Sequence, residues 1–143
     1  LPVIRYRTRD LTRLLPPTSR SMRRIGKITG RSDDMLIIRG VNVFPTQIEE
    51  LILKMPKLAP QYQLVVTRDG HLDKLEVIAE LRLDLTATIS ASETDGLARE
   101  LEHRIKTHVG VSTRVRLVAA AGIERTLTGK ARRVVDQRPK LFP

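Results

Sequence analysis

The chain has 143 residues, a formal net charge of +10 and no cysteine. This length allows one domain, or one domain with a tail, and the 41% hydrophobic content is sufficient for a core. The lack of cysteine excludes disulfides and cysteine metal sites, and no apolar run approaches the ~18 residues of a membrane helix. No basic and apolar leader precedes the first periodic segment, so we expect a soluble, cytoplasmic protein.

The positive charge is concentrated at the two ends of the chain. Residues 1–39 carry ten Lys or Arg against three Asp, and residues 124–143 carry six bases against two acids. The middle, residues 40–123, carries ten bases against eleven acids. A concentrated positive charge attracts anions such as nucleic acid, an acidic membrane or the phosphates of a nucleotide. Solvated surface charge accounts for the same composition, so these classes stay open.

The first forty residues predict little regular structure. Residues 1–24 contain three prolines and no sustained period, which indicates an irregular basic lead-in. Residues 25–29 and 35–38 are apolar segments on either side of turn-forming residues 30–34, which predicts a β-hairpin or two short strands. Gly40 is expected to close that unit.

A helix and a second hairpin are expected next. Pro45 suits the first turn of a helix, apolar residues follow at helical spacing, and Pro56 ends the helix. Residues 61–67 predict a strand, and residues 75–81 alternate between apolar and mostly polar side chains as a half-buried strand. Asp69 and Gly70 supply the turn between these two strands.

The second half of the chain predicts a further helix and strand. Ser92 and Asp95 resemble a capping box, and Gly110 is placed to end the helix. Residues 111–117 alternate as a strand, and a basic tail follows. The order is β-hairpin, then α-β-β-α-β. We therefore expect a small two-layer α+β domain in which two helices cover one face of an antiparallel sheet.

Common catalytic patterns are absent from the sequence. His103 and His108 are five residues apart and do not share a helix face, so we expect no zinc site. No serine lies in a G-x-S-x-G elbow. Gly129 and Lys130 do not form a P-loop, because that loop needs a glycine where Glu124 stands.

The remaining chemistry lies in three short stretches: Tyr6-Arg7-Thr8-Arg9-Asp10, Gly30-Arg31-Ser32-Asp33-Asp34-Met35 and Thr126-Leu127-Thr128-Gly129-Lys130. Their order and separations resemble three C-terminal core motifs of the adenylate-forming ligases. The longer stretch over residues 30–50 is similar to the phenylacetate-CoA ligase branch of that family. The resemblance covers nearly the whole chain, and the second motif is its most specific part.

The resemblance implies a two-step reaction and a division of labour. A carboxylate attacks the α-phosphate of ATP, giving an acyl-adenylate and pyrophosphate, and the thiol of coenzyme A then displaces AMP to form a thioester. Residues 1–29 would lead in from a large N-terminal domain, and residues 30–143 would form a C-terminal lid that rotates between the half-reactions. The N-terminal domain would bind the aryl carboxylic acid and most of the ATP with its Mg²⁺.

The first two motifs imply nucleotide and hinge roles. Asp10 matches the family aspartate that accepts hydrogen bonds from the ribose hydroxyls, a role for which a carboxylate has two acceptor oxygens. Arg31 matches the arginine near ribose and phosphate, where its planar fork suits a two-point contact. Asp33 matches the hinge that absorbs the backbone change of lid rotation.

The remaining matches concern the two half-reactions. Gly40, Val41 and Asn42 match a loop that faces the site in the thioester-forming conformer, where glycine allows close backbone approach. Lys130 matches the family lysine that bridges the carboxylate and the nucleotide during adenylation, when charge develops on the transferring groups.

Two positions depart from the family pattern. Arg9 stands where the wider superfamily usually has glycine, and Glu124 stands where the third motif usually has proline. Both departures leave the chemistry-bearing residues in place. Arg9 makes it an open question whether the backbone there takes a conformation that favours glycine.

Other interpretations stay open for the isolated motifs. Asp33 and Asp34 are also typical of a hairpin turn, and Lys130 is also typical of a solvated basic run. A small nucleic-acid-binding module is the alternative function, although the four aromatic residues form no stacking set on the expected strands. A regulatory ligand-binding domain is a third. We expect ATP, coenzyme A and an aryl acid as partners, and neither nucleic acid nor a membrane.

Overall fold

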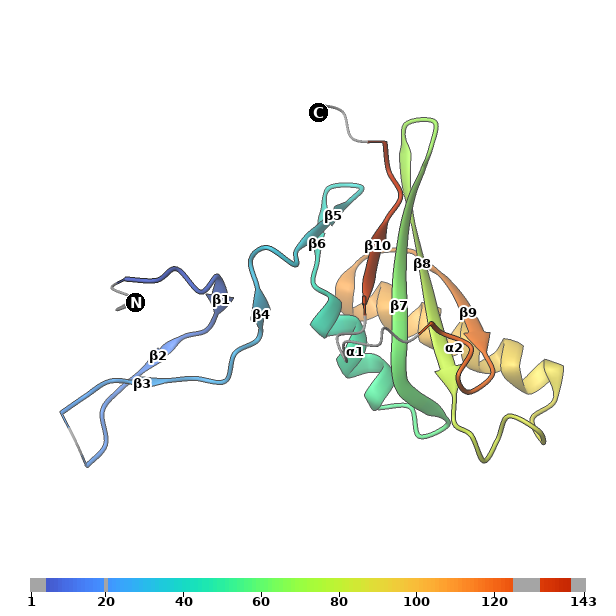
Figure 1. Cartoon of the computed structure of the whole chain (residues 1–143), viewed down its shortest axis with the longest axis horizontal. Helices are drawn as coiled ribbons and strands as arrows, with labels where there is room; N and C mark the ends of the chain where they lie inside the picture. Colours follow the sequence, from blue (N-terminus) through green and yellow to red (C-terminus); the bar gives the residue numbers. More distant parts are fainter. Residues whose placement is uncertain (1–4, 20, 125–131, 140–143) are drawn as a thin grey trace. The chain divides into compact units, whose positions relative to one another are not determined.

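The computed structural model describes residues 5–19, 21–124 and 132–139. The chain divides into two compact units, Leu1–Met35 and Leu36–Pro143 (Figure 1). No helix among the described residues is long and apolar enough to span a bilayer. The predicted boundary between lead-in and lid at residues 29 and 30 stays a prediction.

In the described part of the first unit, four two-residue strands form two antiparallel pairs. β1 (Asp10–Leu11) pairs with β4 (Gly30–Arg31), and β2 (Leu14–Leu15) pairs with β3 (Arg24–Ile25). The Gly26 N–H donates to the Arg13 carbonyl at 2.8 Å, and the Thr29 N–H donates to the Leu11 carbonyl at 2.9 Å. The lead-in therefore contains a short paired ribbon, and the expectation of a wholly irregular segment was wrong.

A tight hairpin begins the second unit. β5 (Leu36–Ile38) pairs with β6 (Val41–Val43), and Ile38 lies opposite Val41 across a two-residue turn. Arg39 and Gly40 form that turn with φ of +49° and +78°. Two-residue turns with positive φ at both positions match the twist of the strands. Of the two alternatives expected over residues 25–38, a β-hairpin or two short strands, the hairpin was wrong: Gly40 lies in the turn of the observed β5–β6 hairpin, and Gly30, expected in a turn, pairs with β1.

The two helices begin and end at residues with clear local signals. In α1 (Pro45–Leu53), proline occupies the first helical position as expected, and the Phe44 N–H donates to Gln47 Oε1 at 3.1 Å. α2 (Ala91–Val109) begins after Ser90, whose Oγ accepts the Glu93 N–H at 3.3 Å. The capping box is therefore Ser90 and Glu93, two residues before the predicted pair. Gly110 ends the helix at φ +84°, as expected.

The main sheet has four strands: β7 (Leu58–Asp69), β8 (Leu72–Leu81), β9 (Arg114–Val118) and β10 (Val134–Asp136), in the order β10-β7-β8-β9. β7 and β8 are antiparallel, as expected. β9 is parallel to β8 and β10 is parallel to β7, so the sheet is mixed. The α2 crossover between β8 and β9 carries the chain back, which makes those strands parallel. The small α+β class is confirmed, whereas the purely antiparallel sheet was wrong.

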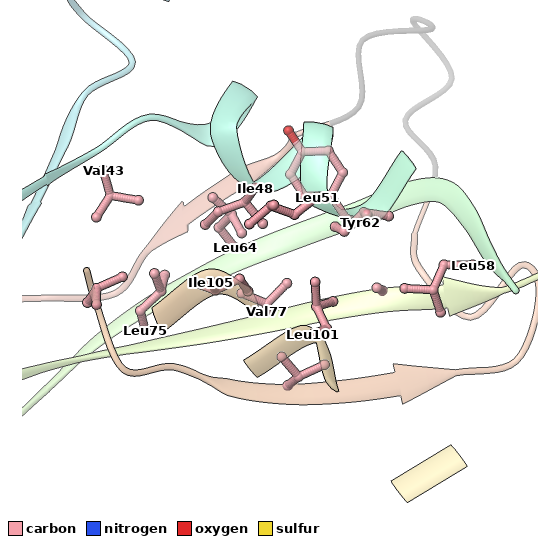
Figure 2. Close-up of a cluster of buried hydrophobic side chains, with 14 of the residues drawn as sticks. Val43, Ile48, Leu51, Leu58, Tyr62, Leu64, Leu75, Val77, Leu101 and Ile105 are labelled. Carbon is pink, nitrogen blue, oxygen red and sulfur yellow. The ribbon is translucent and has the colours of Figure 1, made fainter. Parts of the chain in front are cut away.

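The core of the second unit lies between the sheet and both helices (Figure 2). Alternate β8 residues Leu75, Val77, Ala79 and Leu81 are at most 5% exposed, as the strand periodicity predicted. They pack against helix residues that are also buried, namely Ile48, Leu51 and Ile52 of α1 and Leu101 and Ile105 of α2. Burial of this apolar face is the main stabilising term, at about 25 cal/mol per Å².

Candidate functional site

The paired strands of the first unit bring two predicted nucleotide residues together. Asp10 on β1 and Arg31 on β4 are direct cross-strand partners, which places their Cβ atoms about 5 Å apart. Within the described part of the chain, the Asp10 carboxylate accepts no hydrogen bond, while its own N–H donates to Thr8 Oγ1 at 3.4 Å. Both carboxylate oxygens are thus available to hydroxyl donors, beside a guanidinium.

The predicted hinge residue is bound to the same arginine. Arg31 donates from Nε to Asp33 Oδ1 at 3.0 Å and from Nη2 to Asp33 Oδ2 at 2.9 Å. The Arg9 guanidinium lies 3.6 Å from the same carboxylate. The hydrogen bond from Arg31 holds the pKa of Asp33 below its usual value, and the same bond raises the pKa of Arg31. The Asp33 carboxylate is therefore ionised at neutral pH and lies beside two cations.

The backbone at Arg9 shows why the wider superfamily usually has glycine at this position. Arg9 has φ of +66°, so its backbone takes the left-handed conformation that favours glycine, although the residue is arginine. Its carbonyl accepts the Ser32 N–H at 2.8 Å, which closes the turn region next to Asp33. A side chain at this position is strained but gains an ion pair with Asp33.

The predicted thioester loop is the turn and second strand of the β5–β6 hairpin. Val43 and Ile38 are buried in the core, whereas Asn42 and its cross-strand partner Ile37 are exposed. The hairpin thus has one face against the core and presents Asn42 on the other. Gly40 has open space around the position of a Cβ, so its positive φ is what requires glycine there.

Two arginines tie this hairpin to the rest of the second unit. Arg39 Nη2 donates to the Ser112 carbonyl at 2.7 Å, and Arg138 Nη1 donates to the Ile37 carbonyl at 3.1 Å. No local pattern predicted either contact, because each joins residues far apart in the chain. The apolar pair Val134 and Val135 was the one signal that the tail forms a strand.

The third motif, with Lys130, lies outside the described residues, but the chain on both sides of it is well held. Upstream, the Ile123 N–H donates to Oε1 of Glu80, a β8 carboxylate that is only 1% exposed. Downstream, Arg133 pairs with Glu49 Oε1 at 2.6 Å and lies 5.0 Å from the centre of the Tyr62 ring. The alternation over residues 75–81 predicted that Glu80 lies on the polar face of its strand. The sequence therefore did not predict that this carboxylate is buried.

Sequence comparison shows close relatives over nearly the whole chain. The chain is 63% identical to the phenylacetate-coenzyme A ligase of Aromatoleum evansii, over 98% of the chain and 32% of that enzyme. It is 57% identical to the phenylacetate-coenzyme A ligase of Escherichia coli (strain K12), over 96% of the chain and 31% of that enzyme. The chain thus spans about a third of the length of these relatives.

Solved structures agree with this relationship. A domain of phenylacetate-coenzyme A ligase from Bacteroides vulgatus ATCC 8482 matches with a TM-score of 0.67 and 33% identity, over 77% of this chain and 97% of that one. 2-Hydroxyisobutyryl-CoA ligase in the postadenylation state matches with a TM-score of 0.75 and 34% identity, over 90% of this chain and 28% of that one. The sequence model of the AMP-binding enzyme C-terminal domain matches residues 40–138. The chain therefore belongs to the AMP-binding enzyme C-terminal domain family, as a C-terminal domain of the adenylate-forming ligases.

Proposed function

We propose that this chain is the C-terminal lid of a phenylacetate-CoA ligase. The observation that carries the proposal is its 63% identity to such an enzyme over 98% of the chain. In the first half-reaction, a carboxylate oxygen attacks the α-phosphorus of ATP and pyrophosphate leaves. In the second, the coenzyme A thiol loses its proton and attacks the acyl carbon, and AMP leaves. An aryl acid such as phenylacetate is the proposed substrate, held by an N-terminal domain.

The first unit carries side chains that suit the ribose and phosphate groups of a nucleotide. The Asp10 carboxylate, which accepts no hydrogen bond from the described residues, offers acceptors to a ribose diol, and the Arg31 fork beside it suits ribose or phosphate oxygens. Among the described residues, no three His, Cys, Asp or Glu side chains converge on one point. In this proposal the Mg²⁺ that accompanies ATP is assigned to the N-terminal domain.

The hinge role of Asp33 is supported by its place in the chain. Asp33 lies in the turn between β4 and β5, two residues before the end of the first compact unit. The Asp34 N–H donates to the Arg31 carbonyl at 3.3 Å, which defines this turn. A residue at the end of an element, next to a boundary between compact units, is suited to absorb φ and ψ changes when a domain rotates.

Different parts of the lid serve the two half-reactions in this proposal. Lys130 neutralises developing charge between the carboxylate and the nucleotide during adenylation. After rotation, Gly40, Val41 and Asn42 face the site at which coenzyme A reacts. The exposure of Gly40 and Asn42 supports this role, because the core does not cover these two residues.

The test uses the longer ligase that would contain this chain. It is incubated with phenylacetate, ATP and coenzyme A, and phenylacetyl-CoA and AMP are measured by chromatography. We expect the two products in equal amounts, together with pyrophosphate. Hydrolysis of ATP without thioester formation, or no dependence on an aryl acid, would contradict the proposed function.

A further inference from the structure

We propose that Arg138 is a positioning residue for thioester formation, because it fixes the hairpin that presents Asn42. This inference rests on the proposed function of that hairpin. The supporting geometry lies entirely within the second unit.

Arg138 connects three elements through one guanidinium. Its Nη1 donates to the Ile37 carbonyl of β5 at 3.1 Å and to Asp73 Oδ2 of β8 at 2.9 Å. Its Nη2 donates to Asp136 Oδ2 of β10 at 2.6 Å. The side chain is only 20% exposed, so these bonds are partly shielded from water.

The hydrogen bond to Ile37 acts on the residue opposite Asn42. Ile37 and Asn42 are cross-strand partners, and the pair next to them, Ile38 and Val41, closes the turn. Antiparallel pairs alternate between those that share hydrogen bonds and those that do not. The Ile37 carbonyl therefore points away from β6, where Arg138 donates to it.

This bond holds the outer edge of β5, whereas the core holds only one face of the hairpin. A two-stranded hairpin of three-residue strands is marginal by itself. Leu36, Ile38 and Val43 anchor one face in the core, whereas Ile37 is 53% exposed on the other. Arg138 attaches the outer edge of β5, while Arg39 ties the turn to Ser112.

The carboxylates around Arg138 set the direction of its guanidinium. Asp73 also accepts from Arg68 Nε at 2.8 Å, so it is held by two arginines. The hydrogen bond to Asp136 and the one to Asp73 raise the pKa of Arg138, which stays charged. A planar fork held by two carboxylates is better oriented than a flexible ammonium, so lysine is not equivalent here.

The test measures both half-reactions of the full-length ligase for Arg138→Met, Arg138→Lys and the matched control Arg68→Met. Arg68→Met removes a cation from Asp73 but leaves the bond to Ile37 in place. Pyrophosphate release with acid and ATP reports adenylation, and conversion of supplied phenylacetyl-adenylate by coenzyme A reports thioester formation. A shift of about 1 Å in a positioning element costs up to ~10²-fold.

For Arg138→Met we therefore expect roughly tenfold slower thioester formation with adenylation unchanged. Arg138→Lys should fall between this variant and wild type, and Arg68→Met should match wild type in both assays. Equal slowing of both half-reactions by a folded Arg138→Met, or an equal effect of Arg68→Met, would overturn the inference. If Arg138→Met does not fold, selective slowing by Arg138→Lys supports the inference and wild-type rates in both assays overturn it.

An Asn42→Ala variant separates this inference from the function on which it rests. Selective loss of thioester formation in Asn42→Ala, together with wild-type rates in Arg138→Met, overturns the positioning role alone. If Asn42→Ala leaves thioester formation unchanged, the assignment of the hairpin to that step fails, and the role of Arg138 fails with it.

Discussion

Arg31 and Asp33 are joined by two parallel hydrogen bonds, from Nε to Oδ1 at 3.0 Å and from Nη2 to Oδ2 at 2.9 Å. The arginine is the proposed nucleotide residue and the aspartate is the proposed hinge. The Nε and Nη2 edge of the guanidinium cannot hold this carboxylate and a phosphate with the same donors. Nucleotide contact through that edge therefore competes with the hinge carboxylate, which couples the two proposed roles.

The first prediction concerns the backbone of Asp33. In the full-length ligase, Asp33→Pro fixes φ near −65° and restricts rotation at this residue. We expect the two half-reactions to be slowed unequally, because one lid position is favoured over the other. Pyrophosphate release and the conversion of supplied phenylacetyl-adenylate measure the two rates separately.

The control for this prediction is Asp33→Ala. It removes the same ion pair with Arg31 but leaves the backbone free to rotate. The ratio of the two half-reaction rates should therefore stay closer to wild type in Asp33→Ala than in Asp33→Pro. The hinge assignment fails if proline slows both half-reactions equally, or neither.

Periodicity predicted the parts of the fold that are decided locally. The alternation of Leu75 and Val77 on a strand and the helical spacing of Leu101 and Ile105 each report which side of an element meets the core. These residues are all at most 2% exposed. The burial of Glu80 escaped this pattern, because a segment from elsewhere in the chain covers the other face of β8.

Contacts between distant residues could not be predicted from the sequence. Arg138 contacts Ile37 and Asp73, which are 101 and 65 residues away in the chain. No local pattern distinguishes such an arginine from a solvated one in a basic tail. The site assignments came from the motif resemblance, and the structure adds the pairing of Asp10 with Arg31.

The second prediction is that residues 1–143 alone do not make acyl-CoA. The described residues provide the half-buried Asp10 carboxylate and the exposed Arg31 for a nucleotide, and the proposal assigns the acyl pocket to the N-terminal domain. The chain is incubated with ATP, phenylacetate and coenzyme A, and thioester is measured against the full-length ligase as the positive control. Robust turnover by the isolated chain would show that the proposed division of labour is wrong.

The third prediction tests the core through two leucines of the second unit. Leu101 is 0% exposed and Leu83 is 80% exposed. Leu101→Ala removes buried methyl groups and leaves a cavity, so it should lower the free energy of unfolding by about 2–5 kcal/mol. Leu83→Ala should change that free energy by less than ~0.5 kcal/mol. Urea unfolding of the two variants gives both values, and similar losses would contradict the described core.

The fourth prediction concerns the dependence of stability on acid. Hydrogen bonds from Arg68 and then Arg138 hold the pKa of Asp73 below the ordinary value of 3.8, and Arg138 likewise lowers the pKa of Asp136. The unfolded carboxyls take up protons near 3.8, before the folded ones do. Their contribution to stability is therefore present above that pH and is lost as the pH falls from 3.8 through the lowered values.

Urea unfolding of wild type and Asp73→Asn at neutral pH and at several values below 3.8 measures this loss. Wild type should lose more stability than Asp73→Asn across that window, because the variant has no carboxyl to protonate at this position. Equal losses in the two proteins would mean that the ion pairs of Asp73 do not contribute to acid stability.

The fifth prediction separates the two half-reactions at Lys130. Its positive charge should stabilise the negative charge that develops during adenylation. After the lid rotates it should contribute little, so it raises the rate of the first step alone. In the full-length ligase, Lys130→Ala should lower the rate of pyrophosphate release by about 10²- to 10³-fold, as for loss of an oxyanion donor. Conversion of supplied phenylacetyl-adenylate should change little.

Arg132→Ala, which removes a nearby positive charge, is the matched control and should leave both rates near wild type. Equal slowing of the two assays by Lys130→Ala would show that this lysine is not the adenylation lysine, and the assignment of the third motif would fail.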